Sequence, residues 1–198
     1  MSGDVQVRFC ESLKVGSLRA TRLVICFRYE ADAIRVKKAL GKRLAKYKLK
    51  LNEEKTKMVQ FSKSKSRQGL KQETFDFLGF TFYLGKTLKG ATIPKVKTCG
   101  RRYRSKLNKV KAWIKQIKNR MKLERIWEIF CAKFSGHLQY YGVSFNSEAV
   151  ENFLREAKRI VFKWLNRRSQ RKSFDWDKFD LWISKHPLPR AKIYHKLF

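Results

Sequence analysis

Three consecutive stretches in the second half of the chain repeat apolar residues every three or four positions, which is the period of an amphipathic helix. They run from Tyr103 to Met121, from Leu123 to Tyr141 and from Val150 to Leu165. Asn146 or Ser147 is the expected N-cap of the third helix. Each apolar stripe needs a partner to cover it, so the three helices predict a small bundle.

The first half of the chain has a different pattern. The apolar run Leu23–Phe27 predicts a buried strand, residues 33–47 have helical spacing, and Lys57–Ser62 predicts a second strand. The aromatic stretch Thr74–Gly85 predicts a hairpin, in which Gly79 marks a kink or a close approach of the backbone. This order is a strand-helix-strand unit followed by a hairpin.

The change of period divides the chain at about residue 100. We expect residues 1–22, which show no sustained period, to be weakly structured, residues 23–100 to form the mixed part, and residues 101–198 to be helical. A last short helix is expected from Trp176 to Ile183, before two prolines. The predicted fold class is therefore α+β.

The charge of the chain indicates its class of partner. The sequence holds 48 Lys and Arg against 16 Asp and Glu, a formal net charge of +32, together with 15 Phe, 7 Tyr and 5 Trp. The aromatic content can build a core, whereas the charge repels itself unless a polyanion neutralises it. A nucleic acid is the expected partner.

The remaining compositional features favour a cytoplasmic protein. We find no uninterrupted apolar run of about 18 residues that could span a bilayer, and the first ten residues, MSGDVQVRFC, contain no apolar segment of a signal peptide. Four cysteines lie far apart without a C-x-x-C pair, so neither a zinc site nor a disulfide framework is predicted. We expect no membrane partner and no cofactor.

Five ordered motifs resemble the C-terminal half of group II intron reverse transcriptases, which also act as maturases in RNA splicing. They are LVICFRYEADAIRV, LAKYKLKLNEEKTKMVQFS, FDFLGFTF, FSGHLQYYGVS and VFKWLNRRSQRK, and they cover the chain from about Leu23 to its C-terminus. The resemblance implies that residues 23–100 are the rear of a polymerase palm with a primer-grip-like hairpin. It implies that residues 101–198 are the α-helical thumb, or maturase domain.

The chain departs from this family at the catalytic turn. In the family, a Tyr-Ala-Asp-Asp turn before the strand LVICF helps to hold two metal ions, whereas here Arg19, Ala20, Thr21 and Arg22 occupy those positions. Mg²⁺, which the intact family uses, takes oxygen ligands and is repelled by arginine. We therefore assign no catalytic and no metal-binding residue, and we expect no polymerase activity from the chain alone.

The same four positions suggest an origin for the N-terminal residues. Codons for Tyr-Ala-Asp such as TAC-GCG-GAC, read in another frame, give Thr-Arg, as at Thr21 and Arg22. We hypothesise that residues 1–22 are an out-of-frame remnant of a longer reverse transcriptase gene, so that the chain is N-terminally truncated.

Two basic stretches are candidate RNA-binding sites. Residues 101–120 contain no acid, and phosphate binding is favoured there over a merely solvated face. The run from Arg167 to Lys172 resembles part of the maturase domain, although cations also suit the end of a helix. The predicted RNA-binding cations are Arg101, Arg102, Arg104, Lys106, Lys109, Lys111, Lys115, Lys118, Arg167, Arg168, Arg171 and Lys172.

Three further residues are candidates with a structural alternative. Tyr140 and Tyr141 either stack on bases or lie one in the bundle core and one at its rim. Lys55 matches, by the resemblance, a lysine near the incoming nucleotide, and otherwise it is an exposed turn residue.

Three functions follow from these patterns. The first is an RNA-binding portion of a group II intron reverse transcriptase and maturase, inactive alone as a polymerase. The second is a component of an RNA-directed DNA polymerase that a separate fingers-palm chain completes. The third is a generic basic nucleoprotein, which the aromatic stripes do not favour because charge neutralisation does not need them.

Overall fold

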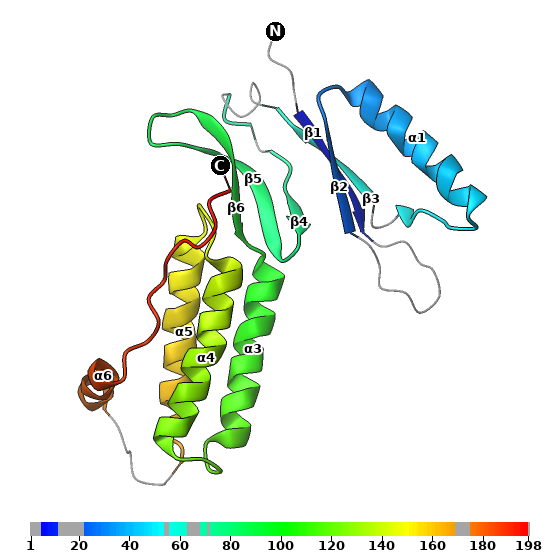
Figure 1. The fold of residues 1–198 in the computed structure, drawn as a ribbon. Coiled ribbons are helices and arrows are strands. Elements are labelled where there is room, and N and C mark those ends of the chain that lie inside the picture. Colours follow the sequence, from blue (N-terminus) through cyan, green and yellow to red (C-terminus); the bar gives the residue numbers. More distant parts are fainter. Residues whose placement is uncertain are drawn as a thin grey trace. The chain divides into compact units, whose positions relative to one another are not determined.

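The computed structural model describes residues 5–11, 22–53, 56–62, 68–70, 72–168 and 175–197, with backbone alone for 5–11, 22 and 23 (Figure 1). The chain folds into two compact units. The first comprises Met1–Phe75 and Phe82–Lys95, and the second comprises Asp76–Thr81 and Val96–Phe198. The fold class is α+β, as the change of hydrophobic period predicts.

The first unit contains a three-stranded antiparallel sheet with the order β2-β1-β3. The predicted strand-helix-strand order is present as β2 (Arg22–Phe27), α1 (Glu30–Lys46) and β3 (Thr56–Phe61). The central strand, β1 (Val5–Glu11), lies within the residues that we expected to be weakly structured. Its alternation of Val5, Val7 and Phe9 with polar or smaller residues is the period of a half-buried strand, a signal that the sequence analysis missed.

A second sheet has the order β4-β5-β6, formed by Phe75–Phe77, Phe80–Lys86 and Thr92–Thr98. Strands β4 and β5 are joined by Leu78 and Gly79, with φ of 48° and 85°. Positive φ at both central residues is the geometry of a tight hairpin turn. The predicted hairpin is therefore confirmed. A Cβ on Gly79 would lie 2.8 Å from the hydroxyl of Tyr141, so this position also requires close approach of the backbone.

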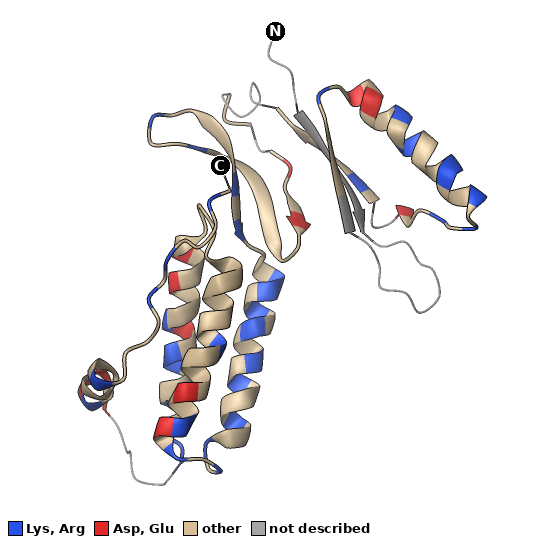
Figure 2. Cartoon of the chain, viewed as in Figure 1, with Lys and Arg blue, Asp and Glu red and all other residues tan. Residues whose placement is uncertain are grey.

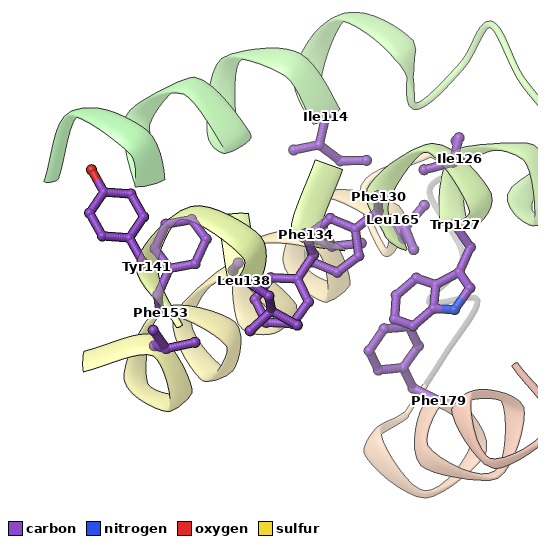
Figure 3. Packing of buried hydrophobic residues seen from close by; sticks show 13 residues of the cluster. Ile114, Ile126, Trp127, Phe130, Phe134, Leu138, Tyr141, Phe153, Leu165 and Phe179 are labelled. Atoms are coloured by element: carbon purple, nitrogen blue, oxygen red, sulfur yellow. The ribbon is translucent and has the colours of Figure 1, made fainter. Parts of the chain in front are cut away.

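Most of the second unit is helical. Its helices are α3 (Gly100–Ile117), α4 (Leu123–Tyr141), α5 (Ser147–Leu165) and the short α6 (Trp176–Lys185), which confirms the four predicted helical segments. Their apolar stripes face one another in a single core (Figure 3). Its fully buried members, at 0 % exposure, are Ile114, Ile126, Leu138, Ala157, Val161 and Phe179.

Asn146 is the N-cap residue of α5 by position, but its side chain does not cap the helix. The amide oxygen instead accepts a hydrogen bond from the backbone N–H of Thr98 at 2.7 Å. The amide nitrogen donates to the Tyr141 carbonyl at 2.8 Å and to the Thr98 hydroxyl at 3.0 Å. Because Asn146 is 1 % exposed, these bonds satisfy a buried polar group and join the end of β6 to the start of α5.

Candidate nucleic-acid interface

Helix α3 presents a broad basic face. Its apolar positions, including Ile114, face the core, so most of its cations are left on the opposite side. No acid lies in α3, and Figure 2 shows Lys and Arg along the whole helix. The exposed cations that the sequence analysis predicted here are Arg101, Arg102, Arg104, Lys109, Lys111 and Lys115.

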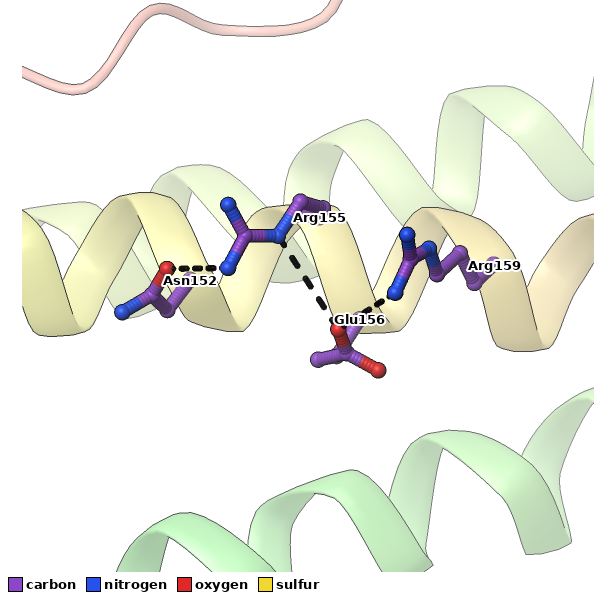
Figure 4. Close-up of polar contacts among 4 residues, drawn as sticks. All are labelled: Asn152, Arg155, Glu156 and Arg159. Atoms are coloured by element: carbon purple, nitrogen blue, oxygen red, sulfur yellow. Dashed lines mark hydrogen bonds and ion pairs between the residues drawn. The ribbon is translucent and has the colours of Figure 1, made fainter.

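Helix α5 also carries cations, but three of them have acidic partners. Glu156 Oε1 lies 3.1 Å from Arg159 Nη1 and 4.0 Å from Arg155 Nε. Arg155 also donates to the Asn152 side-chain oxygen at 2.6 Å, and Figure 4 shows this group along one side of the helix. Lys158 is paired with Asp180 of α6 at 2.6 Å. These three cations of α5, Arg155, Lys158 and Arg159, therefore offer a polyanion less uncompensated charge than the cations of α3 do.

Lys106 departs from the prediction for α3. Its ammonium lies 4.5 Å from the ring centroid of Tyr141 and 3.4 Å from Nδ1 of His137, on the inner side of the helix. Burial, followed by the charges of Lys109 and Arg102, lowers the pKa of Lys106. This half-buried lysine is packed on aromatic rings, and we remove it from the exposed basic face.

The two candidate tyrosines take the structural alternative that the sequence left open. Tyr141 is 2 % exposed and belongs to the core, so its ring cannot stack on a base. Tyr140 lies at the rim, 49 % exposed, and donates a hydrogen bond from its hydroxyl to the Leu78 carbonyl at 2.6 Å. Its ring also stacks on Phe80, with 5.8 Å between the ring centroids. Of the two, only Tyr140 has a ring surface that RNA can reach.

His137 lies beneath Lys106 in an aromatic stack. It is 6 % exposed, with ring centroids at 3.9 Å from Phe153 and 4.7 Å from Tyr141. Burial, aided by the neighbouring Lys106 charge, lowers the pKa of His137 to about 3. The imidazole is therefore neutral at physiological pH and adds no positive charge at this end of the bundle.

At the other end of α3, three cations surround the ring of Trp164, a residue of α5. Lys115 Nζ, Lys118 Nζ and Arg167 Cζ lie 5.1, 5.3 and 5.1 Å from its centroid. Lys118 also donates to the Arg167 carbonyl at 2.7 Å. We refer to these four residues as the Trp164 cluster. The sequence predicted the three cations of this cluster as RNA-binding residues but not Trp164, which lies within the apolar stripe from Val150 to Leu165.

The structure describes only some of the remaining predicted positions. Arg168 is half-buried and donates to the Met121 carbonyl at 2.9 Å, so part of its hydrogen-bonding capacity serves the turn between α3 and α4. Lys55, Arg171 and Lys172 lie outside the described residues, as do positions 19–21 of the substituted catalytic turn. Arg22 begins β2, and only its backbone is described.

Two features are absent from the part of the chain that the structure describes. Within the ranges given above, no group of three or more His, Cys, Asp or Glu side chains could hold a metal ion. In the same ranges, no helix combines the length and the apolar character that a membrane span requires.

Comparison with known proteins does not assign the chain to a family. No family model, no curated protein and no solved structure matches it.

Proposed function

We propose that this chain is an RNA-binding protein that belongs with the group II intron reverse transcriptases and maturases, and that its helical unit corresponds to their thumb. The observation that supports RNA binding is the outer face of α3, where exposed cations occur without a single acid. Neutralising such a face by RNA phosphates releases condensed counterions, which is the usual source of affinity for nucleic acids.

The aromatic core supports a folded recognition domain over a simple charge neutraliser. Thirteen buried residues from α3, α4, α5 and α6 form one cluster, which fixes the helices that present the cations. A rigid scaffold places phosphate contacts at defined positions, and such contacts set the register of a protein on its nucleic acid.

The chain alone is proposed to lack polymerase activity. By the resemblance, Arg19 and Arg22 stand where group II intron reverse transcriptases have a metal-binding turn, and two-metal phosphoryl transfer requires carboxylates. Purified protein with Mg²⁺, deoxynucleotides and a primed RNA template should give no extension above a mock purification. Extension by the purified chain would contradict this part of the proposal.

The experiment for RNA binding compares two triple variants of equal charge. Changing Lys109, Lys111 and Lys115 together to Gln should weaken binding to a labelled RNA stem-loop and flatten the plot of log K against log salt by about two to three units. The control changes three exposed lysines of α1, which lies in the other unit, to Gln. These are Lys38, Lys42 and Lys46.

The control separates a defined interface from diffuse attraction. If α3 carries the interface, the α1 variant should bind almost as well as the unmodified protein, with a slope changed by less than about one unit. Equal losses in the two variants would mean that net charge alone attracts the RNA. No loss in the α3 variant, with its circular dichroism unchanged, would mean that the basic face of α3 is only solvated.

A further inference from the structure

The cations of the Trp164 cluster are held together by an aromatic ring. Each of the three charged groups lies about 5 Å from the centroid of Trp164, so any two are within roughly 10 Å, about one Debye length at 0.1 M salt. Ring faces attract cations because of their quadrupole, but a ring carries no net charge. The cluster therefore gathers three positive charges without neutralising them.

Within the described residues, no carboxylate forms an ion pair with these three charges, which belong to Lys115, Lys118 and Arg167. The sequence contains no Asp or Glu in residues 77–123 or 157–174, so neither chain segment that forms the cluster supplies an acid. Gathered like charges repel one another, and an external anion would relieve that repulsion.

A second tryptophan in the same unit shows the compensated arrangement. Lys158 Nζ lies 5.8 Å from the ring centroid of Trp176, and the same ammonium is paired with Asp180 at 2.6 Å. The Trp176 ring also stacks on Phe162 at 3.8 Å. There a cation and a ring belong to a structural contact between α5 and α6. The Trp164 cluster also places cations over a tryptophan ring, but it has three cations, and none of them forms an ion pair among the described residues.

We propose that the Trp164 cluster is a phosphate-binding site for the RNA backbone, and that Trp164 is the positioning residue that aims Lys115, Lys118 and Arg167 at one phosphate. This inference rests on the proposed RNA binding and gives it a defined anchor. The guanidinium supplies a planar pair of donors and the two ammonium groups supply point charges, a combination suited to phosphate oxygens.

The position of the cluster extends the RNA path beyond one helix. Lys115 and Lys118 belong to the end of α3 and its cap, whereas Trp164 lies in the last turn of α5 and Arg167 follows the C-cap of that helix. Lys118 fixes the two ends to each other through its hydrogen bond to the Arg167 carbonyl. RNA bound along the basic face of α3 would thus reach a convergent site where that helix meets α5.

The test replaces the ring and leaves every charge in place. Trp164→Leu keeps apolar bulk but removes the quadrupole, so we expect the affinity of the full chain for a labelled RNA stem-loop to fall about three- to tenfold. The salt slope should flatten by about one unit because the cations no longer converge. Trp164→Phe, which retains a ring, should lie between Leu and the unmodified protein.

Trp176→Leu is the matched control, because its cation already has an acidic partner. It should bind RNA with the unmodified affinity, to within about twofold, and with the unmodified slope. A folded Trp164→Leu variant with unmodified affinity and slope would overturn the phosphate site while leaving RNA binding by α3 intact. If Trp164→Leu does not fold, changing Lys115, Lys118 and Arg167 to Gln tests the same site from its exposed side.

Two further outcomes separate this inference from its premise. Failure of the unmodified chain to bind any RNA stem-loop or single strand would overturn the proposed function and the phosphate site together. Vesicles containing phosphatidylserine form the second arm. Binding to these vesicles in preference to RNA, lost in Trp164→Leu, would show that the cluster serves a lipid surface and would overturn its assignment to RNA.

Discussion

Lysines lie over aromatic rings towards both ends of helix α3, over the buried Tyr141 near its start and over the partly exposed Trp164 near its end. Near the start, Lys106 is half-buried over Tyr141 and beside His137, and burial lowers its pKa. Near the end, Lys115 is exposed and Lys118 is half-buried, and both lie over Trp164. The same pair of residue types therefore supports a packed core at one end and a charged surface at the other.

Neither charge nor contact with a ring therefore identifies an RNA-binding residue by itself. A cation can serve a polyanion only where solvent, and therefore the ligand, can reach it. Burial also favours the uncharged form of a lysine or histidine, as at Lys106 and His137. The first end of α3 should thus govern stability, and the second end should govern affinity.

Truncating the core at the first end should produce the largest effect. Phe153 is 4 % exposed and its ring lies against His137, Phe134 and Tyr103. Phe153→Ala should lower the free energy of unfolding by about 3 to 5 kcal/mol, measured by urea denaturation. Trp164→Leu, at the other end, should cost less than about 2 kcal/mol. Equal costs would break the proposed division between the two ends.

The first end should also make stability depend on pH through His137. Its pKa is about 3 in the folded chain against an ordinary 6.5, so the unfolded chain binds a proton that the folded chain does not between these values. The free energy of unfolding therefore keeps its full value, as far as His137 determines it, above pH 6.5. It declines as the pH falls towards 3, by about 1 kcal/mol per pH unit. Denaturant titrations at pH 7, 6 and 5 measure this slope.

Two histidine variants check the source of that slope. His137→Phe keeps an aromatic ring beside Phe153 and removes the titrating group, so its stability should change less between pH 7 and 5. His195 is exposed, and His195→Gln should retain the full decline. A decline that survives in His137→Phe would assign the pH dependence to other groups.

Hydrophobic period predicted most of the elements because amphipathic patterns determine which face of an element is buried. The pattern located α3, α4, α5 and α6. Gly79 indicated a kink or a close backbone approach, and the structure places it against Tyr141. Strand β1 was missed because its alternation covers only a few residues of a segment with mixed composition. Its pairing between β2 and β3 is a long-range property that no local pattern encodes.

The candidate site was predictable as a helix but not as individual contacts. Spacing places Ile114 inward and Lys111 outward, yet Lys106 lies near the boundary of the two faces, where the packing of α4 decides its burial. Trp164 has the spacing of a core residue. Its role beside Lys118 and Arg167 depends on where α3 and α5 end relative to each other, which the sequence does not specify.

Tyr140 lies beside the buried end of α3 but remains exposed. Tyr140→Phe removes the hydrogen bond to the Leu78 carbonyl and should cost about 0.5 to 1.5 kcal/mol of stability, measured in urea. RNA affinity should not change, because the ring that could stack on a base remains. A loss of affinity in Tyr140→Leu but not in Tyr140→Phe would show that RNA also contacts this end.

The smallest expected effect is the difference between two lysine variants, at positions one turn apart on the same helix. Lys109 is exposed on the basic face, whereas Lys106 lies over the ring of Tyr141. Lys109→Gln should flatten the plot of log K for RNA against log salt by about 0.7 to 0.9, the contribution of one neutralised phosphate. Lys106→Gln removes the same formal charge and should change the slope by less than about 0.3.

Fluorescence titrations of one labelled stem-loop at several salt concentrations measure both slopes, and urea denaturation supplies the second readout. Lys106→Gln should alter the free energy of unfolding, because its ammonium contacts His137 and Tyr141, whereas Lys109→Gln should leave it within about 0.5 kcal/mol. Equal slopes for the two variants would mean that Lys106 turns outward to meet RNA. In that case burial in the free protein would not decide which cations bind, and the distinction between the two ends of α3 would apply to stability alone.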